Sequence, residues 1–239
     1  MECVSVGKKI KMQTSETMKL GAVITLAGGF MDAYSYICRG KVFANAQTGN
    51  LLLLGINLFE RKWGLALSYC IPVVAFSMGI IITEAVQYLL EKKNAQKNVW
   101  LHWKQITLVL EILSLITVSF IPQSLNLLAN SITSMACGMQ VQSFRTIHGH
   151  TIATTMCIGN LRSGTESLCR FLQYKDVSLL RKTVLYYGIN CYFVCGAILG
   201  HFFIKVIQEK AILICSFILF IAFLLMFIDV KRARNNQHE

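Results

Sequence analysis

The sequence is poor in charged residues and in proline. Of its 239 residues, 15% are Asp, Glu, Lys or Arg and two are proline, whereas 54% are hydrophobic. Soluble domains usually carry about 25% charged residues, so the composition argues against an ordinary soluble domain. The scarcity of proline permits long helices, because proline interrupts helix interiors.

Motifs for nucleotide binding and for common catalysis are also missing. The sequence has no P-loop, no G-x-G-x-x-G fingerprint and no G-x-S-x-G elbow. ATP-driven transport by this chain alone is therefore not expected, and no cofactor is predicted. His148-Gly149-His150, with Cys157 nearby, is the one stretch open to metal binding. A polar loop is the better interpretation, since no further ligand spacing accompanies it.

Nine cysteines and a formal charge of +11 need separate explanations. The cysteines are odd in number, mostly within apolar runs and without a C-x-x-C pair, which favours free thiols. The Lys and Arg residues form short clusters between apolar runs, as they do on the cytoplasmic flanks of membrane helices. No nucleic-acid motif accompanies the charge. The expected partner is the lipid bilayer and not a nucleic acid.

The apolar runs divide the chain into eight candidate segments. A helix needs about 20 apolar residues to cross the hydrocarbon core, and helices satisfy their own backbone in lipid. All eight are therefore predicted to be helical. The segments are 18–38, 42–60, 65–90, 105–122, 124–146, 151–171, 183–206 and 210–229.

The segments show signs of an internal repeat. Thr48-Gly49-Asn50-Leu51 recurs 110 residues later as Ile158-Gly159-Asn160-Leu161, and further identities follow in the same order along the chain. We interpret the chain as a single membrane domain built from repeats of about 18–122 and 124–229. Short tails, 1–17 and 230–239, precede and follow them.

Segments 42–60 and 151–171 are too polar to face lipid along their whole length. The first begins with several polar residues, and only about ten apolar residues follow; the second contains Arg162 and Glu166. A lone charge at the centre of a membrane helix costs about 2.5–3.5 kcal/mol. Irregular backbone at membrane depth is tolerated only inside the protein or beside a water-filled cavity. Both segments are therefore predicted to be broken or re-entrant.

The distribution of positive charge supports this prediction. With eight spans and a cytoplasmic N-terminus, 14 Lys and Arg residues lie inside and 9 outside. With six spans and both termini cytoplasmic, 17 lie inside and 6 outside, which fits the positive-inside rule better. Three spans per repeat place the second repeat upside down relative to the first. The predicted fold is an all-α integral membrane protein of about six transmembrane helices, arranged as two inverted three-helix repeats.

Three blocks of sequence carry a family resemblance that covers nearly the whole chain. They are Gly28–Tyr36 (GGFMDAYSY), Val42–Asn50 (VFANAQTGN) and Ala153–Ser163 (ATTMCIGNLRS). The chain resembles the YoaK-type family of small bacterial membrane proteins, a domain of unknown function. The resemblance implies a multi-pass protein of the bacterial cytoplasmic membrane with about six spans, and it implies no substrate or mechanism.

Asp32 is the sharpest candidate for a functional side chain. It lies in the second half of segment 18–38, and ionisable residues inside membrane helices tend to face the bundle interior. It is predicted to couple transport to an ion or proton, or to bind the substrate. The alternatives are a structural ion pair with Arg145 or Arg162, or a helix end near water.

The two Gly-Asn breaks are the next candidates. Each opens a short helix, and the free N–H groups at a helix start favour an anion or a carbonyl oxygen. Arg162 is suited to a carboxylate or phosphate, or else balances Asp32 or Glu166. For the other polar residues of the two breaks, the alternative is a buried turn in which the polar groups only hydrogen-bond to one another. The predicted substrate- or ion-binding residues are Asp32, Asn45, Gln47, Thr48, Gly49, Asn50, Thr155, Gly159, Asn160 and Arg162.

Other polar residues in the apolar segments are weaker candidates. Glu111 is a second titratable group within a predicted span, and Asn126, Asn130 and Gln140 are typical of hydrogen bonds between helices. The function predicted from these features is a secondary transporter or permease for a small polar or anionic solute. A membrane enzyme acting on a lipid-like substrate, and a partner or sensor subunit without a pore, are the alternatives. A homodimer is compatible with the sequence but has no specific support in it.

Overall fold

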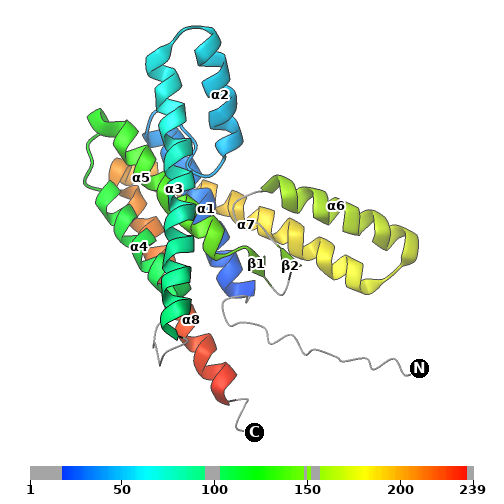
Figure 1. Ribbon diagram of the computed structural model, residues 1–239. Helices are drawn as coiled ribbons and strands as arrows, with labels where there is room; N and C mark the ends of the chain where they lie inside the picture. The colour runs from blue at the N-terminus through cyan, green and yellow to red at the C-terminus, as the bar shows by residue number, and fades with distance from the viewer. Residues whose placement is uncertain (1–17, 95–102, 148–149, 152–156, 236–239) are drawn as a thin grey trace.

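The computed structural model describes residues 18–94, 103–147, 150–151 and 157–235. These residues form a bundle of α-helices (Figure 1), as the sequence predicts. A two-residue antiparallel ladder is the one β element among them, and two short 3-10 helices precede α5 and α8. The elements are α1 (Met18–Cys38), α2 (Gln47–Phe59), α3 (Trp63–Asn94), α4 (Trp103–Val118), η2 (Gln123–Leu125), α5 (Asn126–Ser143), β1 (Thr146–Ile147), β2 (His150–Thr151), α6 (Cys157–Tyr174), α7 (Val177–Ile207), η3 (Gln208–Ala211) and α8 (Ile212–Asn235).

Helix lengths divide the elements into two kinds. α3 has 32 residues and α7 has 31, which makes each about 45–50 Å long. α2 has only 13 residues and follows a loop, so the helical part of segment 42–60 is too short to cross a bilayer. α6 has 18 residues but carries Arg162, Glu166 and Arg170. Segment 42–60 therefore contains a loop and a helix too short to span, whereas α6 is one continuous charged helix, and residues 152–156 before it lie outside the described part of the chain.

Each short helix forms a hairpin with a long one. α2 packs against α3, and α6 packs against α7, and both hairpins project from the rest of the bundle (Figure 1). The remaining part of α3 packs against α5, and the remaining part of α7 packs against α1. α4 and α8 complete the bundle, where α4 contacts α5 and α8 contacts α1. These main contacts of α1–α4 thus have counterparts among those of α5–α8.

Four glycines allow the closest helix contacts. A Cβ atom built on each would lie 1.9–2.1 Å from a backbone oxygen of the facing helix, so no other residue fits without separating the helices. The contacts also match in position, because Gly29 and Gly138 are 109 residues apart, and Gly79 and Gly196 are 117 residues apart. The glycines and the residues whose carbonyls they face are Gly29 with Phe193, Gly138 with Phe76, Gly196 with Leu26 and Gly79 with Met135.

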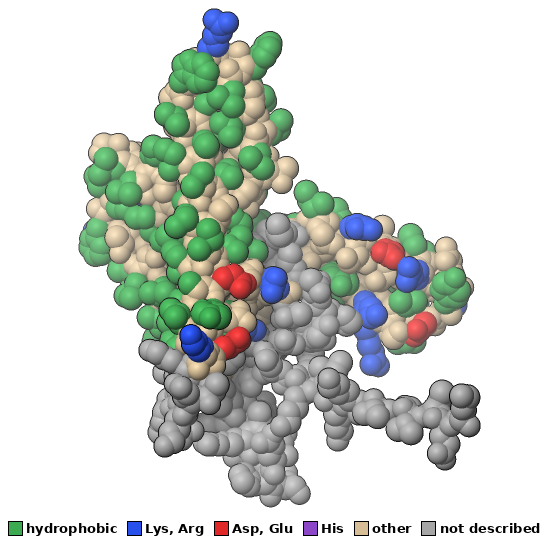
Figure 2. All heavy atoms as spheres, viewed as in Figure 1, with side chains coloured by type: hydrophobic (Ala, Val, Ile, Leu, Met, Phe, Trp, Pro, Cys, Tyr) green, Lys and Arg blue, Asp and Glu red, His purple; other side chains and the backbone are tan. Residues whose placement is uncertain are grey.

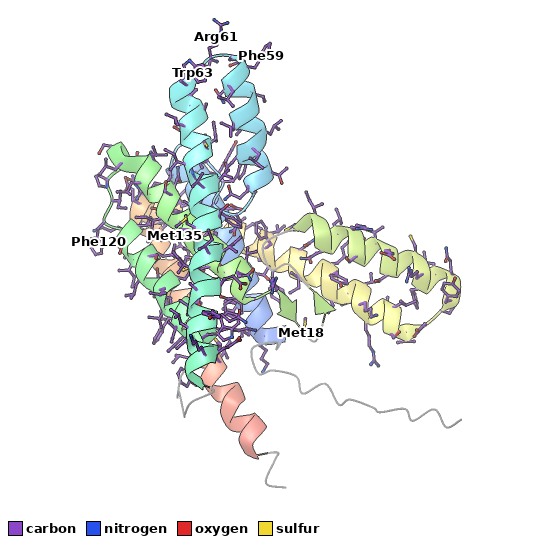
Figure 3. All side chains as sticks on the ribbon, viewed as in Figure 1. Met18, Phe59, Arg61, Trp63, Phe120 and Met135 are labelled. Carbon is purple, nitrogen blue, oxygen red and sulfur yellow. The ribbon has the colours of Figure 1, made fainter. Side chains whose placement is uncertain are left out.

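Apolar side chains cover much of the outer surface. Figure 2 shows them along the α2–α3 hairpin and the adjoining bundle, with Lys or Arg at the hairpin tip. Phe59 is 90% exposed and Trp63 is 64% exposed at that tip (Figure 3). By length and composition, three stretches of the described residues can cross a membrane: Met18–Cys38, Trp63–Lys92 and Val177–Phe227, the last of which covers α7 and most of α8. This surface is that of a membrane protein.

A buried arginine joins the ends of several helices. Arg39, just after α1, is completely buried. Its guanidinium donates to the hydroxyl of Tyr34 (2.9 Å), to the carbonyl of Val118 at the end of α4 (3.1 Å) and to the side-chain oxygen of Asn126 at the start of α5 (3.3 Å). The carbonyl of Arg39 accepts from Asn130 Nδ2 at 2.6 Å. One residue therefore holds α1, α4 and α5 together.

Candidate functional site

The chain reverses direction immediately after α1. Gly40 has φ of 87° and Lys41 has φ of 65°, and the left-handed backbone at both positions turns the chain back along the helix it has just left. Asn45 then reaches the middle of α1, where its Nδ2 donates to the carbonyl of Gly28 at 3.1 Å. α2 therefore begins alongside the interior of α1 and not at its end.

The carboxylate of Asp32 binds backbone N–H groups at the start of α2. Its Oδ1 accepts from the backbone N–H of Asn45 at 2.7 Å and of Ala46 at 3.4 Å, just before the first residue of α2. A negative charge at this position is stabilised by the free N–H groups and by the dipole of the helix. Asp32 is buried, and it takes part in neither of the ion pairs found among the described residues. Asp32 thus lies neither at a helix end near water nor in an ion pair with an arginine of the described residues; it binds the backbone just before another helix.

The other polar residues at this break bind the loop that precedes α2. Asn50 is fully buried; its Oδ1 accepts from the N–H of Phe43 at 3.0 Å and its Nδ2 donates to the carbonyl of Phe43 at 2.7 Å. Gln47 Nε2 donates to the carbonyl of Ala44 at 2.7 Å. Gly49 lies under the ring of Phe43, whose Cδ2 would be 2.8 Å from an added Cβ. These contacts fix the reversed loop, whereas Asn45 Oδ1 stays buried without a hydrogen-bond partner.

The second break lies close to the first. α6 begins at Cys157, whose carbonyl accepts from Asn190 Nδ2 of α7 at 3.1 Å. Asn190 lies one turn before Phe193, whose carbonyl faces Gly29 in α1. The start of α6 therefore lies against the helix that packs on α1, and the start of α2 lies against α1 itself, at Gly28 and Asp32.

Several predicted site residues do not face this region. Thr48, Gly159 and Arg162 are exposed, and Arg162 has no ion pair within the described ranges. Its neighbour Glu166 pairs instead with Arg170 at 2.7 Å. Asn160 is buried on the opposite face of α6 from Arg162, because two residues along a helix correspond to a rotation of about 200°. Thr155 lies outside the described residues.

Polar residues of α5 bind neighbouring backbone and side chains, as the sequence predicts for interhelical hydrogen bonds. Asn126 and Asn130 hold Arg39, and Gln140 Nε2 donates to the carbonyl of Ile24 in α1 at 2.6 Å. Glu111 in α4 is different, because it is completely buried and neither carboxyl oxygen has a hydrogen-bond partner. It is the most isolated ionisable side chain of the described bundle.

Comparison with known proteins agrees with this geometry. A family model described as a protein of unknown function (DUF1275) matches residues 20–225. The chain belongs to this family. The UPF0700 transmembrane protein YoaK of Bacillus subtilis (strain 168) is 24% identical over 173 residues, which cover 69% of this chain and 73% of the relative. No solved structure gives a significant match.

Membership in the family confirms the YoaK-type resemblance and supports the membrane assignment. The match spans both Gly-Asn breaks, so the segment from Asp32 to Asn50 and the start of α6 both lie within the family domain. Because the family is one of unknown function, the chemistry of the site has to come from its geometry.

Replacing Asp32 tests whether its carboxylate holds the start of α2. We expect Asp32→Ala to cost about 1–2 kcal/mol, the usual cost of losing an N-terminal helix cap. Hydrogen exchange in lipid nanodiscs should then be about tenfold faster for the amides of residues 45–50, which is the same free energy expressed as an opening equilibrium. Asp32→Asn keeps an acceptor oxygen and should have a smaller effect.

A matched control is available at the start of α7. Asp176 Oδ1 accepts from the N–H of Ser178 at 2.8 Å, and this contact is exposed. Asp176→Ala should accelerate exchange near residue 178 and leave residues 45–50 unchanged. Unaltered protection of residues 45–50 in Asp32→Ala would show that other contacts hold the start of α2.

Proposed function

We propose that this chain is a secondary transporter or permease for a small polar or anionic solute. The observation that carries the proposal is that α2 begins against Asp32 in the interior of α1, while α6 begins against α7, which packs on the same helix. Secondary transporters commonly bind their solutes where interrupted helices begin near the middle of the membrane, because free N–H groups there recognise polar or anionic groups. The proposed membrane is the bacterial cytoplasmic membrane.

The proposed topology has six spans, formed by α1, α3, α4, α5, α7 and α8, with both termini cytoplasmic. The paired contacts of α1–α4 and α5–α8 support two repeats. In Figure 1, α1 begins and α8 ends at the same end of the bundle, as six spans require. The charge distribution supports the orientation, because exposed basic residues are abundant on the α6–α7 hairpin, which this topology places inside.

Asp32 gives this arrangement a way to alternate between two states. Its carboxylate occupies the N–H groups at the start of α2, where an anionic solute would also bind. A solute that replaces Asp32 there would release the reversed loop 39–46 from α1. Differential binding of the solute and of Asp32 to the same N–H groups would then shift the population of open and closed states.

Reconstitution provides the test of this proposal. Purified protein in liposomes should accumulate at least one member of a metabolite pool of small polar and anionic solutes, as measured by mass spectrometry of the vesicle contents. Asp32→Ala should reduce this uptake about tenfold, because without the carboxylate the closed contact with the start of α2 cannot re-form and the protein no longer alternates between the two states. Arg170→Ala, which removes an exposed ion pair on α6, is the control and should leave uptake unchanged. Failure of every solute in the pool to enter would contradict the proposal.

A partner or sensor subunit is the second candidate, and one observation favours it. An open, mostly apolar hollow lies on the outer side of α2, lined by Leu51, Leu52, Gly55, Ile56, Phe59 and Glu60. Such a hollow is compatible with contact to another membrane helix as well as to lipid. The liposome assay separates the two candidates, because a subunit without a pore would move no solute alone.

A further inference from the structure

Glu111 lies where an ionised side chain has no compensation. Both of its oxygens are buried without hydrogen-bond partners, and Leu108 and Leu115, one turn away on either side, are completely buried on the same face of α4. A carboxylate isolated in this way would cost many kcal/mol, whereas the neutral acid costs far less. An ionisable residue inside a membrane bundle is a functional candidate for the same reason.

The described side chains of α5 and α8 supply no charge to balance Glu111. α5 has no Asp, Glu, Lys, Arg or His between residues 126 and 143, and α8 has none between 212 and 227. On α3, Glu84 accepts from Gln142, Glu91 accepts from Gln87, and Lys92 lies over the ring of Tyr88. On α4 itself, the buried Lys104 lies two turns before Glu111. The thiols of Cys137 in α5 and Cys215 in α8 are completely buried on these neighbouring helices.

Cys137 connects this region with the candidate site. Its thiol lies 3.6 Å from the sulfur of Met31 in α1, the residue before Asp32. Further buried oxygens without partners lie on the same two helices, at Thr25 in α1 and at Ser134 and Gln140 in α5. A sparse set of polar atoms therefore lies along α1 and α5, and the thiol of Cys137 is among them.

From this placement we propose that Glu111 is a proton-binding site, at which a proton is taken up and released as the bundle between α4, α5 and α8 opens to water. In the release step, the O–H bond of the carboxyl group breaks, the proton passes to water, and no electron is transferred. A metal ion fits less well, because the described residues contain no group of three His, Cys, Asp or Glu side chains placed to hold one. The proposal that this proton drives solute movement rests on the proposed transporter function, whereas proton binding at Glu111 does not.

Labelling with dicyclohexylcarbodiimide tests the proposal without any solute. This apolar reagent adds across the O–H group of a protonated carboxyl group in an apolar setting and leaves a stable adduct. In detergent-solubilised full-length protein, peptide-resolved mass spectrometry should find the adduct at Glu111. The extent of labelling should fall about fivefold or more between about pH 5.5 and about pH 8.5, because only the protonated form reacts. Glu111→Gln should lose the adduct. Glu84→Gln removes an exposed carboxyl group instead and should retain the adduct at Glu111.

Two outcomes would overturn the proposal. One is the absence of an adduct at Glu111 in the unsubstituted protein, including the case in which only Asp32 is labelled. The other is labelling of Glu111 that does not change with pH, since a proton that never exchanges does not serve a binding site. Because both are read on the unsubstituted chain, poor folding of Glu111→Gln does not affect them. Loss of solute uptake with labelling intact would contradict only the transporter proposal, whereas uptake without pH-dependent labelling would contradict only this one.

Discussion

Replacing Arg39 with alanine should strongly destabilise the bundle. The substitution leaves the carbonyl of Val118 and the side-chain oxygen of Asn126 without their donor, and it removes the donor to Tyr34. A buried polar group left unsatisfied costs about 1–3 kcal/mol, and breaking a buried charged interaction typically costs about 3–5 kcal/mol in total. For a chain of this length, the midpoint of thermal unfolding should fall by about 10 °C.

Thermal unfolding in detergent, followed by a fluorescence probe, measures this loss. Arg39→Lys should recover part of the stability, because a lysine keeps the charge near the end of α4 but does not reach three acceptors in one plane. Arg61→Ala is the matched control, since Arg61 lies exposed at the tip of the α2–α3 hairpin (Figure 3). Equal midpoints for Arg39→Ala and Arg61→Ala would show that the joint around Arg39 contributes little.

Substitution by alanine should change the stability of the protein in opposite directions at two glycines of α7. At Gly196, the added Cβ would lie 1.9 Å from the carbonyl oxygen of Leu26, and this backbone atom moves only if α1 and α7 separate. We expect Gly196→Ala to cost about 1–3 kcal/mol, the usual cost of overpacking. At Gly188, no atom lies within 4 Å of an added Cβ, and alanine should stabilise the helix by about 0.5–1 kcal/mol.

The same comparison is possible on α3. Gly79→Ala would place its Cβ 2.0 Å from the carbonyl oxygen of Met135, whereas Gly64 has open space. The free energy of unfolding in urea should fall for Gly79→Ala and Gly196→Ala by similar amounts. Their double substitution should be close to additive, because the two contacts lie in separate helix pairs. A stabilising effect of alanine at Gly79 or Gly196 would contradict the close approach of these helices.

The sequence predicted the helices and the shortness of α2 well, because these follow from local composition. Apolar runs are long enough for helices wherever the described chain has a long one, and the Gly-Asn pairs mark the starts of α2 and α6 to within three residues. The exposure of Arg162 could also have been predicted from the sequence. Asn160, Gly164 and Ser167 form one helical stripe that is buried against α7, and Arg162 is off that stripe.

The contacts of Asp32 and Arg39 could not be predicted from the sequence, because both depend on the path of the chain in three dimensions. Asp32 meets the start of α2 only because the chain turns back at Gly40 and Lys41, and no periodic pattern encodes that path. Arg39 follows an apolar segment, so the six-span charge count places it among the six basic residues outside the membrane. Its burial depends on the end of α4 and the start of α5, which lie 79 and 87 residues further along the chain. Long-range partners of this kind are set by tertiary packing and not by local sequence.

The pairing of α1 with α7 and α8 also governs the order in which the molecule can assemble. α1 is synthesised before α7 and α8, yet these main partners end at residues 207 and 235. Until those helices are made, the face of α1 around Gly29 lacks the helix that packs against it in the finished bundle. The α3–α5 pair, by contrast, is complete once residue 143 has been synthesised. The α3–α5 contact can therefore form while α1 still waits for its partners.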